Sequence, residues 1–337
     1  MNVLVIDGAG VTRLLPMAAC MDVMAEALAS LSRAEAQMPL RNIVWLPGRV
    51  GALASMPALL GSGSAGAMGI KAISVFPGNH GTALDSHQGV VLLFEMERGQ
   101  LLSITDATAV TAIRTAAVSG VATRALARAD AGDLAILGSG TQARTHLEAM
   151  LLARPVRRVR VWSRSPENAW AFAARESARH GVAIEVAGSA REAALGADLI
   201  CTVTSSPEPL LLGDWLSPGA HVNAVGAVGP SVRELDTEAV VRSRLFVDRR
   251  ESAENEAGEF VMARSEGAIG VDHIRGEIGE VLLGRAEGRT SAGDVTVFRA
   301  VGLAVEDVAS ARHIYRRAVE SGVGTWVELG GGRDAGA

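Results

Sequence analysis

Cysteine is scarce in this chain of 337 residues, and long apolar runs are missing. Cys20 and Cys201 lie far apart, which excludes a disulfide framework and favours a reducing compartment such as the cytoplasm. No run of about 18 apolar residues is free of glycine, serine or charge, so no membrane span is expected. The N-terminus, MNVLVIDGAG, lacks the basic region of a signal peptide. The net charge of -5 argues against a nucleic-acid binder.

Lysine is rarer still, because 32 residues are lysine or arginine and only Lys71 is lysine, which leaves 31 arginines. An ammonium group is compact and can release its proton, whereas guanidinium is wide and permanently charged. Either Lys71 has a function that arginine cannot perform, or it is one surface lysine that survived by chance.

Metal and nucleophile signatures are also missing. The seven histidines show no HxxxH or HxH spacing and there is no CxxC pair, so no metal site is expected. Serine, cysteine and histidine show no nucleophile-elbow context, so hydrolase chemistry has no support. His87, in the polar stretch DSHQG, is expected in a turn or at the entry to a strand.

Two kinds of pattern divide the chain, and its length also favours two domains. The first part is rich in strands, predicted at 41–46, 69–76, 89–96 and 101–105, with helices at 16–31 and 107–128. Strands then alternate with helices, which predicts parallel βαβ units in a doubly wound sheet; the strands are expected at 133–137, 159–162, 184–188, 197–204, 220–226 and 244–248. A helix at 302–319 could belong to either part.

A dinucleotide fingerprint begins the second part. Gly138, Gly140 and Ala143 form G-x-G-x-x-A directly after the strand 133–137 and at the start of a helix, the context that the motif requires. The first glycine permits a tight turn, the second lets a pyrophosphate approach, and the alanine allows close packing. Thr141 and Gln142 would present free N–H groups to the phosphates. A turn with two glycines in an unrelated α/β fold is the alternative.

The next strand ends in Ser163, Arg164 and Ser165. An NAD enzyme usually carries an acid there, which accepts a hydrogen bond from the ribose 2′-hydroxyl. Arginine and two hydroxyls suit a 2′-phosphate instead, so NADPH is favoured over NADH. Alternatively, Arg164 stacks on the adenine or faces solvent.

Three cations of the first part are candidates for substrate binding. Lys71 lies in GIKAISVFPGN, Arg114 in TAIRTAA, and Arg41 begins a predicted strand. Guanidinium groups bind carboxylates through two parallel hydrogen bonds, so such a set suits a small carboxylate. Taken singly, an arginine is more often a solvated surface residue.

Long segments of the chain resemble the ornithine cyclodeaminase/mu-crystallin family. They are PLRNIVWLPG, GIKAISVFPGN, DSHQGVVLLFE, TAIRTAAVS, AILGSGTQA, GAHVNAVGA, RELD and VFRAVGLAVED, between about residues 38 and 310. The resemblance implies an α/β protein with a discontinuous α+β substrate-binding and dimerisation domain at 1–115 and 310–337, and a Rossmann domain at 116–309. It also implies a homodimer, with substrate in the cleft between the domains.

The resemblance also implies site residues. The family's carboxylate-binding positions match Arg41, Lys71 and Arg114. Cyclodeaminases carry a catalytic aspartate where this chain has Val228, and an acid facing the substrate's distal amine where it has Arg299. Ketimine reductases of the mu-crystallin branch lack that aspartate, carry an arginine after the second strand and use NADPH. This chain shares the first two features, through Val228 and Arg164, and so resembles that branch more closely.

The expected activity is therefore NADPH-dependent reduction of small cyclic ketimine carboxylates, with Lys71 as electrostatic partner or proton relay. Three alternatives remain open: an ornithine cyclodeaminase, an amino-acid dehydrogenase, and a non-catalytic protein that binds NADPH. In each case the partner is a small imine or amino acid that bears a carboxylate.

Overall fold

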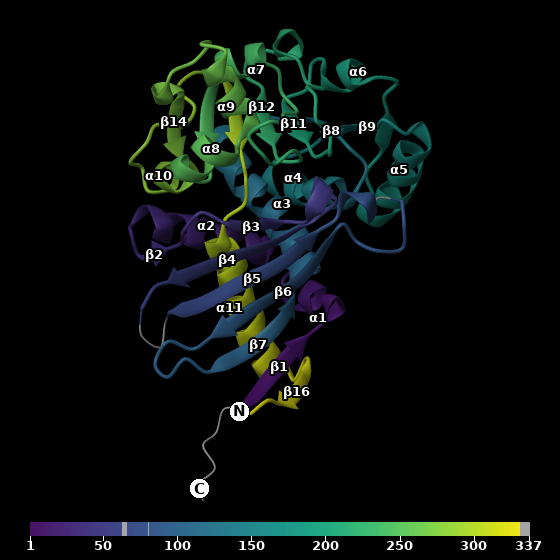
Figure 1. The fold of residues 1–337 in the computed structure, drawn as a ribbon. Helices are drawn as coiled ribbons and strands as arrows, with labels where there is room; N and C mark the ends of the chain where they lie inside the picture. The colour runs from purple at the N-terminus through teal and green to yellow at the C-terminus, as the bar shows by residue number, and fades with distance from the viewer. Residues whose placement is uncertain (63–65, 80, 331–337) are drawn as a thin grey trace, which may run out of the picture. The chain divides into compact units, whose positions relative to one another are not determined.

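The chain divides into two compact units, and each contains one sheet (Figure 1). The computed structural model describes residues 1–62, 66–79 and 81–330. Unit 1 comprises residues 1–114 and the chain from Leu303 onward, and unit 2 comprises Thr115–Gly302. The chain thus returns from unit 2 to unit 1 between residues 302 and 303, whereas the expected domain boundary was between 309 and 310. The boundary comes earlier because helix α11 begins at Ala304 and lies entirely in unit 1.

The sheet of unit 1 has the strand order β16-β1-β7-β6-β5-β4-β2, and β3 also pairs with β4. Among the described strands of this sheet, only β1 and β7 run parallel, and the other pairs are antiparallel. The strands are β1 Asn2–Ile6, β2 Ala36–Gln37, β3 Asn42–Trp45, β4 Ala52–Leu60, β5 Ala67–Val75, β6 His87–Phe94, β7 Leu101–Asp106 and β16 Thr325–Glu328. His87 therefore begins a strand, where a turn was one expectation.

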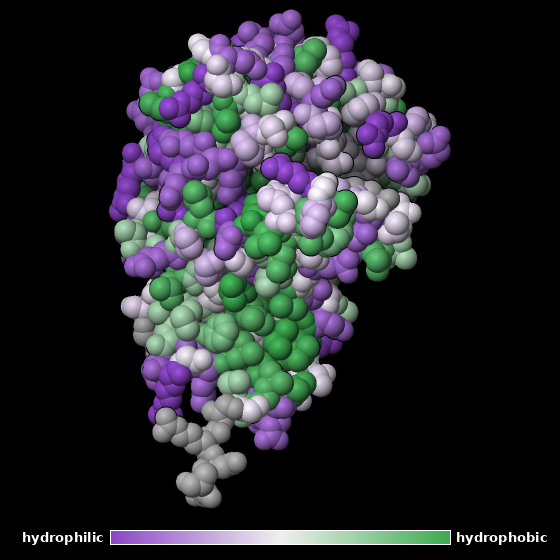
Figure 2. Space-filling model, viewed as in Figure 1, coloured by the Kyte–Doolittle hydropathy of each residue, from purple (hydrophilic) through white to green (hydrophobic). Residues whose placement is uncertain are grey.

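Helix α11, Ala304–Ser321, covers one face of this sheet and packs against β4 to β7 and against α2, Met17–Ser32. The strands alternate accordingly, with buried residues toward α11. The opposite face is apolar but only partly buried, and Figure 2 shows hydrophobic residues gathered over this sheet. In the described part, no single helix is long and apolar enough to cross a membrane, although α1, Gly8–Leu14, and α2 meet that test together across an 82° bend.

The sheet of unit 2 is parallel throughout, with the order β10-β9-β8-β11-β12-β15-β13-β14. Its strands are β8 Asp133–Leu137, β9 Arg158–Trp162, β10 Ile184–Val186, β11 Leu199–Thr202, β12 His221–Ala224, β13 Ser243–Val247, β14 Ile274–Glu277 and β15 Val295–Arg299. Because the order reverses between β8 and β11, the carboxyl ends of these strands form the switch point where such sheets bind ligands. The predicted combination of a doubly wound sheet and an α+β unit is confirmed.

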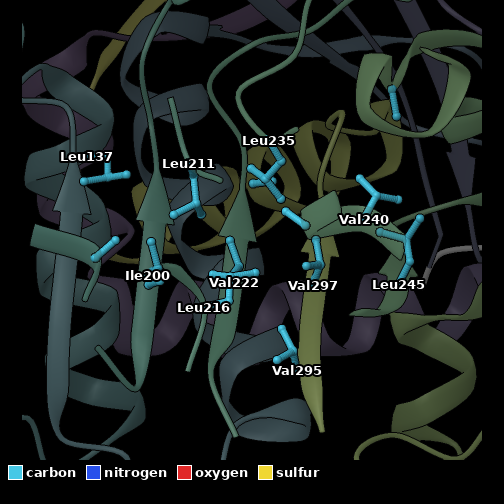
Figure 3. Close-up of a cluster of buried hydrophobic side chains, with 14 of the residues drawn as sticks. Leu137, Ile200, Leu211, Leu216, Val222, Leu235, Val240, Leu245, Val295 and Val297 are labelled. Atoms are coloured by element: carbon cyan, nitrogen blue, oxygen red, sulfur yellow. The ribbon is translucent and has the colours of Figure 1, made fainter. Parts of the chain in front are cut away.

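The helices of unit 2 complete the βαβ units. They are the second half of α3 (Ala107–Leu126), α4 Thr141–Ala153, α5 Pro166–His180, α6 Ala190–Ala194, α7 Thr237–Val241, α8 Arg250–Glu256, α9 Gly258–Ser265 and α10 Ile278–Leu282. The core lies on the central strands, where Figure 3 shows Leu137, Ile200, Val222 and Val297 side by side. All four side chains are inaccessible to solvent, as expected for parallel strands covered on both faces.

Candidate functional site

Lys71 lies in the middle of β5, on the face of the sheet that α11 covers. It is opposite Met56 of β4 and Val91 of β6, and only 2% of its surface is exposed. Its Nζ is 2.7 Å from Oδ2 of Asp307, in the first turn of α11. The only lysine of the chain is therefore buried and ion-paired, and is not a surface residue.

Arg114 binds the same helix end. Its Nε donates to Oδ1 of Asp307 at 3.1 Å, and its Nη1 donates to Oε2 of Glu306 at 2.7 Å. Both carboxylates are completely buried, and Arg114 is 5% exposed. We call Lys71, Arg114, Glu306 and Asp307 the charge quartet. Its two cations and two anions balance.

Arg41 is half-buried, immediately before β3. Its positive charge contributes to lowering the pKa of Lys71, so its guanidinium lies within electrostatic reach of that amine. The structure therefore brings the three predicted cations together. Arg41 adds a third cation near the quartet, and guanidinium and ammonium groups are the side chains that bind carboxylates most strongly.

Burial is the main reason that the pKa of Lys71 falls from its ordinary value of 10.5 to about 8. Asp307 opposes the fall, while Arg114 and Arg41 add to it. Burial raises the pKa of Asp307, but Arg114 and Lys71 outweigh it and hold that pKa below its ordinary value. The quartet thus contains an anionic carboxylate beside an amine that can exchange its proton near neutral pH.

Glu306 and Asp307 were missed as site residues from the sequence, although their segment VGLAVED was noted. Two acids in the first turn of a helix are ordinary, since they favour the positive end of the helix dipole. Glu306 partly fills that role, because its Oε2 accepts from the backbone N–H of Leu303 at 3.2 Å. Only the tertiary structure shows that both also face the cations.

In unit 2, the fingerprint residues lie at the switch point. Gly138 follows β8 with φ of +128°, and a Cβ there would lie 2.7 Å from the carbonyl oxygen of Val203. A Cβ on Gly140 would meet nothing within 4 Å, so its backbone is open to a ligand. Ala143 is fully buried in the first turn of α4. This geometry fits the pyrophosphate of a dinucleotide at the helix N-terminus.

Thr141 and Gln142 begin α4, as the motif requires. His146 anchors this turn, since its Nδ1 donates to the carbonyl of Gln142 at 2.7 Å and its Nε2 lies 2.9 Å from Oγ of Ser119. Burial lowers the pKa of His146 to about 4, so the ring is neutral at physiological pH. The neutral ring holds the first turn of α4 in place through these two contacts.

The end of β9 places its three residues differently. Oγ of Ser163 accepts from Oγ of Ser139 in the glycine loop at 2.9 Å, which joins the two loops. Oγ of Ser165 caps α5 by accepting from the N–H of Asn168, and it donates to Glu167 at 2.8 Å. Arg164 is exposed and forms no ion pair with any described residue. It is the cation that a ligand at this strand end would meet.

The structure corrects the expectation for Arg299. Its side chain is completely buried at the end of β15, with Nε 2.5 Å from Oε2 of Glu259. The guanidinium also donates to the carbonyls of Ala224, Ala227 and Ala300. Arg299 therefore cannot face a substrate's amine. Val228, in contrast, is 44% exposed in the loop after β12. Among the described residues, no group of three or more His, Cys, Asp or Glu could hold a metal ion.

Comparison with known proteins matches residues 2–322 to the model of the ornithine cyclodeaminase/mu-crystallin family. The chain is 39% identical to ketimine reductase mu-crystallin of Mus musculus, over 82% of this chain and 84% of that protein. The structure of Thermococcus litoralis Δ1-pyrroline-2-carboxylate reductase with NADH and L-proline is 36% identical, with a TM-score of 0.93 over 96% and 99% of the two chains. An archaeal alanine dehydrogenase dimer with bound NAD is 33% identical, with a TM-score of 0.91 over 98% and 100%.

Proposed function

Because the chain belongs to the ornithine cyclodeaminase/mu-crystallin family, we propose that it is an NADPH-dependent reductase of small cyclic ketimine carboxylates. Its substrates would be Δ1-pyrroline-2-carboxylate and Δ1-piperideine-2-carboxylate, and its products proline and pipecolate. The observation that carries the proposal is the buried charge quartet beside Arg41, a site that gathers three cations and contains one titratable amine.

In this proposal, unit 1 binds the substrate. Arg41 and Arg114 bind its carboxylate, which fixes the face of the ring. Lys71 stabilises the carboxylate and holds a proton near the imine nitrogen, while Asp307 orients the ammonium. A cyclic imine that arrives protonated needs little acid catalysis, so valine at 228 is tolerated. When bound, the nicotinamide supplies the hydride for the C=N carbon.

Unit 2 binds the cofactor through Gly138, Gly140 and the first turn of α4, and Arg164 contacts the 2′-phosphate of NADPH. The exposure of Arg164 supports this role, because no described carboxylate neutralises it. Ser163 and Ser165 shape the strand end, although the hydroxyl of Ser165 is already engaged in capping α5. NADH remains a usable but weaker cofactor, as the related structures with NADH and NAD bound would allow.

We also propose that the protein is a homodimer in the cytoplasm. The outward face of the unit 1 sheet supports the dimer, because it presents a broad, partly exposed apolar surface. That surface is formed by Leu53, Pro57, Leu59, Met68, Ile70, Val90, Leu92, Phe94, Leu102 and Ile104. Cys20 and Cys201 are buried free thiols, which suits a reducing compartment. Sedimentation equilibrium tests the dimer, and a monomer would contradict it.

A panel of substrates tests the reaction. Purified protein receives NADPH or NADH with each cyclic imine, or with keto acids with and without amines, and cofactor absorbance is followed. We expect oxidation of NADPH with the cyclic imines. The resemblance to alanine dehydrogenase favours a second candidate, an amino-acid dehydrogenase, which would instead form NAD(P)H from a free amino acid. Tight cofactor binding without any turnover would indicate a binding protein.

A further inference from the structure

A second buried charged cluster lies in unit 2, where the proposed reaction gives its members no role. Glu234, Glu259 and Arg299 expose 0%, 1% and 0% of their surfaces. The Nε of Arg299 donates to one carboxylate oxygen of Glu259, and the other oxygen accepts from the backbone N–H of Glu234 at 2.9 Å. We call these three residues the loop network.

Glu234 ties together two loops. Its carboxylate accepts four hydrogen bonds, from Oγ1 of Thr202 at 2.9 Å, from N and Oγ1 of Thr204 at 2.7 and 2.6 Å, and from N of Gly226 at 2.7 Å. Thr204 follows β11, and Gly226 follows β12. These four donors offset part of the cost of burying the carboxylate, although burial still raises the pKa of Glu234 above its ordinary value.

The two loops also touch through their backbones. A Cβ on Gly226 would lie 2.1 Å from the carbonyl oxygen of Thr204, so no side chain fits there. Arg299 holds the same region from β15, by donating to the carbonyls of Ala224 and Ala227. Three neighbouring strands therefore end in loops whose backbone groups are bound to buried charges.

These loops lie at the carboxyl ends of β11 and β12, next to the fingerprint. Val203 shows the proximity, because its carbonyl oxygen blocks a Cβ on Gly138. In doubly wound sheets, the crevice outside these strand ends holds the ligand. With the pyrophosphate at α4, the nicotinamide end of the cofactor must extend along the ends of the strands beyond β8.

We propose that Glu234, Glu259 and Arg299 are positioning residues that hold the nicotinamide end of the cofactor site in its binding shape before the cofactor arrives. The inference rests on the proposed function only in requiring a nicotinamide dinucleotide. It assigns no catalytic step to the network, which acts through the backbone of the two loops. Loss of the network should therefore weaken binding of the nicotinamide half of the cofactor and leave binding of the adenosine half unchanged.

Glu234→Gln tests this, because it keeps the size of the side chain but replaces one acceptor oxygen by a donor. Fluorescence titration measures the dissociation constants of NADPH and of 2′-phospho-ADP-ribose, which lacks the nicotinamide, without any imine. We expect binding of NADPH to weaken about tenfold, and binding of the fragment to change less than about twofold. NADH and ADP-ribose form the equivalent pair if the protein prefers NADH.

The matched control is Glu176→Gln, the same substitution at a fully buried glutamate of the same unit. Glu176 contacts Arg175 and His180 of its own helix, α5. We expect it to lower Tm while NADPH binding stays near the wild-type value. Equal weakening of NADPH and of the fragment in Glu234→Gln, or an effect no larger than that of the control, would overturn the proposal. Absence of imine turnover would not affect this readout.

Glu259→Gln is the second variant and is used if Glu234→Gln does not fold. It should also weaken binding of NADPH about tenfold and change binding of 2′-phospho-ADP-ribose less than about twofold. Hydrogen exchange on the wild-type protein completes the test without any variant. The amides of Thr204 and Gly226 should be protected before cofactor is added, since their partner is already in place. Exchange at the rate of exposed loop amides until NADPH is added would contradict a preformed site.

Discussion

The two units bury charge in different ways. In the charge quartet of unit 1, ion pairs join side chain to side chain, as between Lys71 and Asp307 or Arg114 and Glu306. In the loop network of unit 2, most bonds join a side chain to the backbone, as between Glu234 and the N–H groups of Thr204 and Gly226. The two arrangements suit different tasks.

A side chain that is paired with another side chain can exchange partners when a ligand brings a carboxylate. A side chain that is bonded to the backbone of several loops cannot do so without moving those loops. The quartet is therefore suited to bind and titrate, and the network to hold shape. Buried ion pairs are weak evidence for stability, because desolvation offsets much of the attraction. That argues for functional roles in both units.

The largest effect is expected at the quartet's amine. Lys71→Arg keeps the charge but should lower kcat on the order of 10²-fold or more, because guanidinium is wider and does not release a proton near neutral pH. Lys71→Met should also lose activity, mainly through a higher KM for the imine. The measurement is steady-state oxidation of NADPH. A Lys71→Arg enzyme near the wild-type rate would mean that charge alone suffices at this position.

A change at the cofactor end should affect a different quantity. Arg164→Asp removes a charged partner of the 2′-phosphate and supplies an acceptor for a 2′-hydroxyl, so preference should move from NADPH toward NADH. The loss is about 1.5–3 kcal/mol, roughly 10- to 100-fold in relative kcat/KM. Kinetics with both cofactors at a fixed imine concentration measure it. Equal use of both by the wild type would show that Arg164 does not contact the phosphate.

Asp307→Asn separates positioning from charge within the quartet. Asparagine keeps the size but not the charge, so Lys71 and Arg114 lose a buried counter-ion. We expect kcat/KM for the imine to fall about tenfold or more, and the free energy of unfolding to fall by about 3–5 kcal/mol. Binding of NADPH should stay unchanged, in contrast to Glu234→Gln. Urea unfolding measures the free energy of unfolding, and fluorescence titration measures NADPH binding. Weaker NADPH binding by Asp307→Asn would contradict separate roles for the two units.

The smallest effect concerns pH. If Lys71 acts as the ammonium, whose pKa is about 8, kcat/KM should decline as the pH rises above about 8. Asp307→Asn should move that decline to lower pH, because the carboxylate no longer stabilises the ammonium. Folding lowers the pKa of Lys71, so between pH of about 8 and 10.5 the unfolded chain binds more protons. The free energy of unfolding should therefore rise with pH there, relative to Lys71→Met. A profile with no change near pH 8 would contradict protonated Lys71 as the active form.

The sequence predicted those parts of the fold whose signals are local. The fingerprint at Gly138 follows an apolar strand, and the strand 69–76 alternates, so both appeared where expected. Strand β4 was not predicted, because Pro57 interrupts its pattern. The structure tolerates this proline because β4 pairs there with Ile70 of β5 on one side, while β2 and β3 cover other parts of its opposite edge.

The candidate site was predictable for its cations and not for its anions. Lys71 stood out by its rarity, whereas Asp307 lies 236 positions later in the chain, and no local signal joins the two. At Arg299 the error is of another kind. The family resemblance placed this position opposite the substrate's amine, but the side chain is completely buried. Which partner a charge meets depends on tertiary packing, and a single sequence does not contain that information.

The most direct test of the account is the stoichiometry of one reaction. Wild-type protein receives Δ1-pyrroline-2-carboxylate and a limiting amount of NADPH, and both the cofactor consumed and the proline formed are measured, with Lys71→Met in parallel. The account predicts one proline for each NADPH oxidised by the wild type and, at an imine concentration below the KM of the variant, much slower change of both quantities with Lys71→Met. Saturable binding of NADPH without any proline, or equal turnover by Lys71→Met, would contradict it.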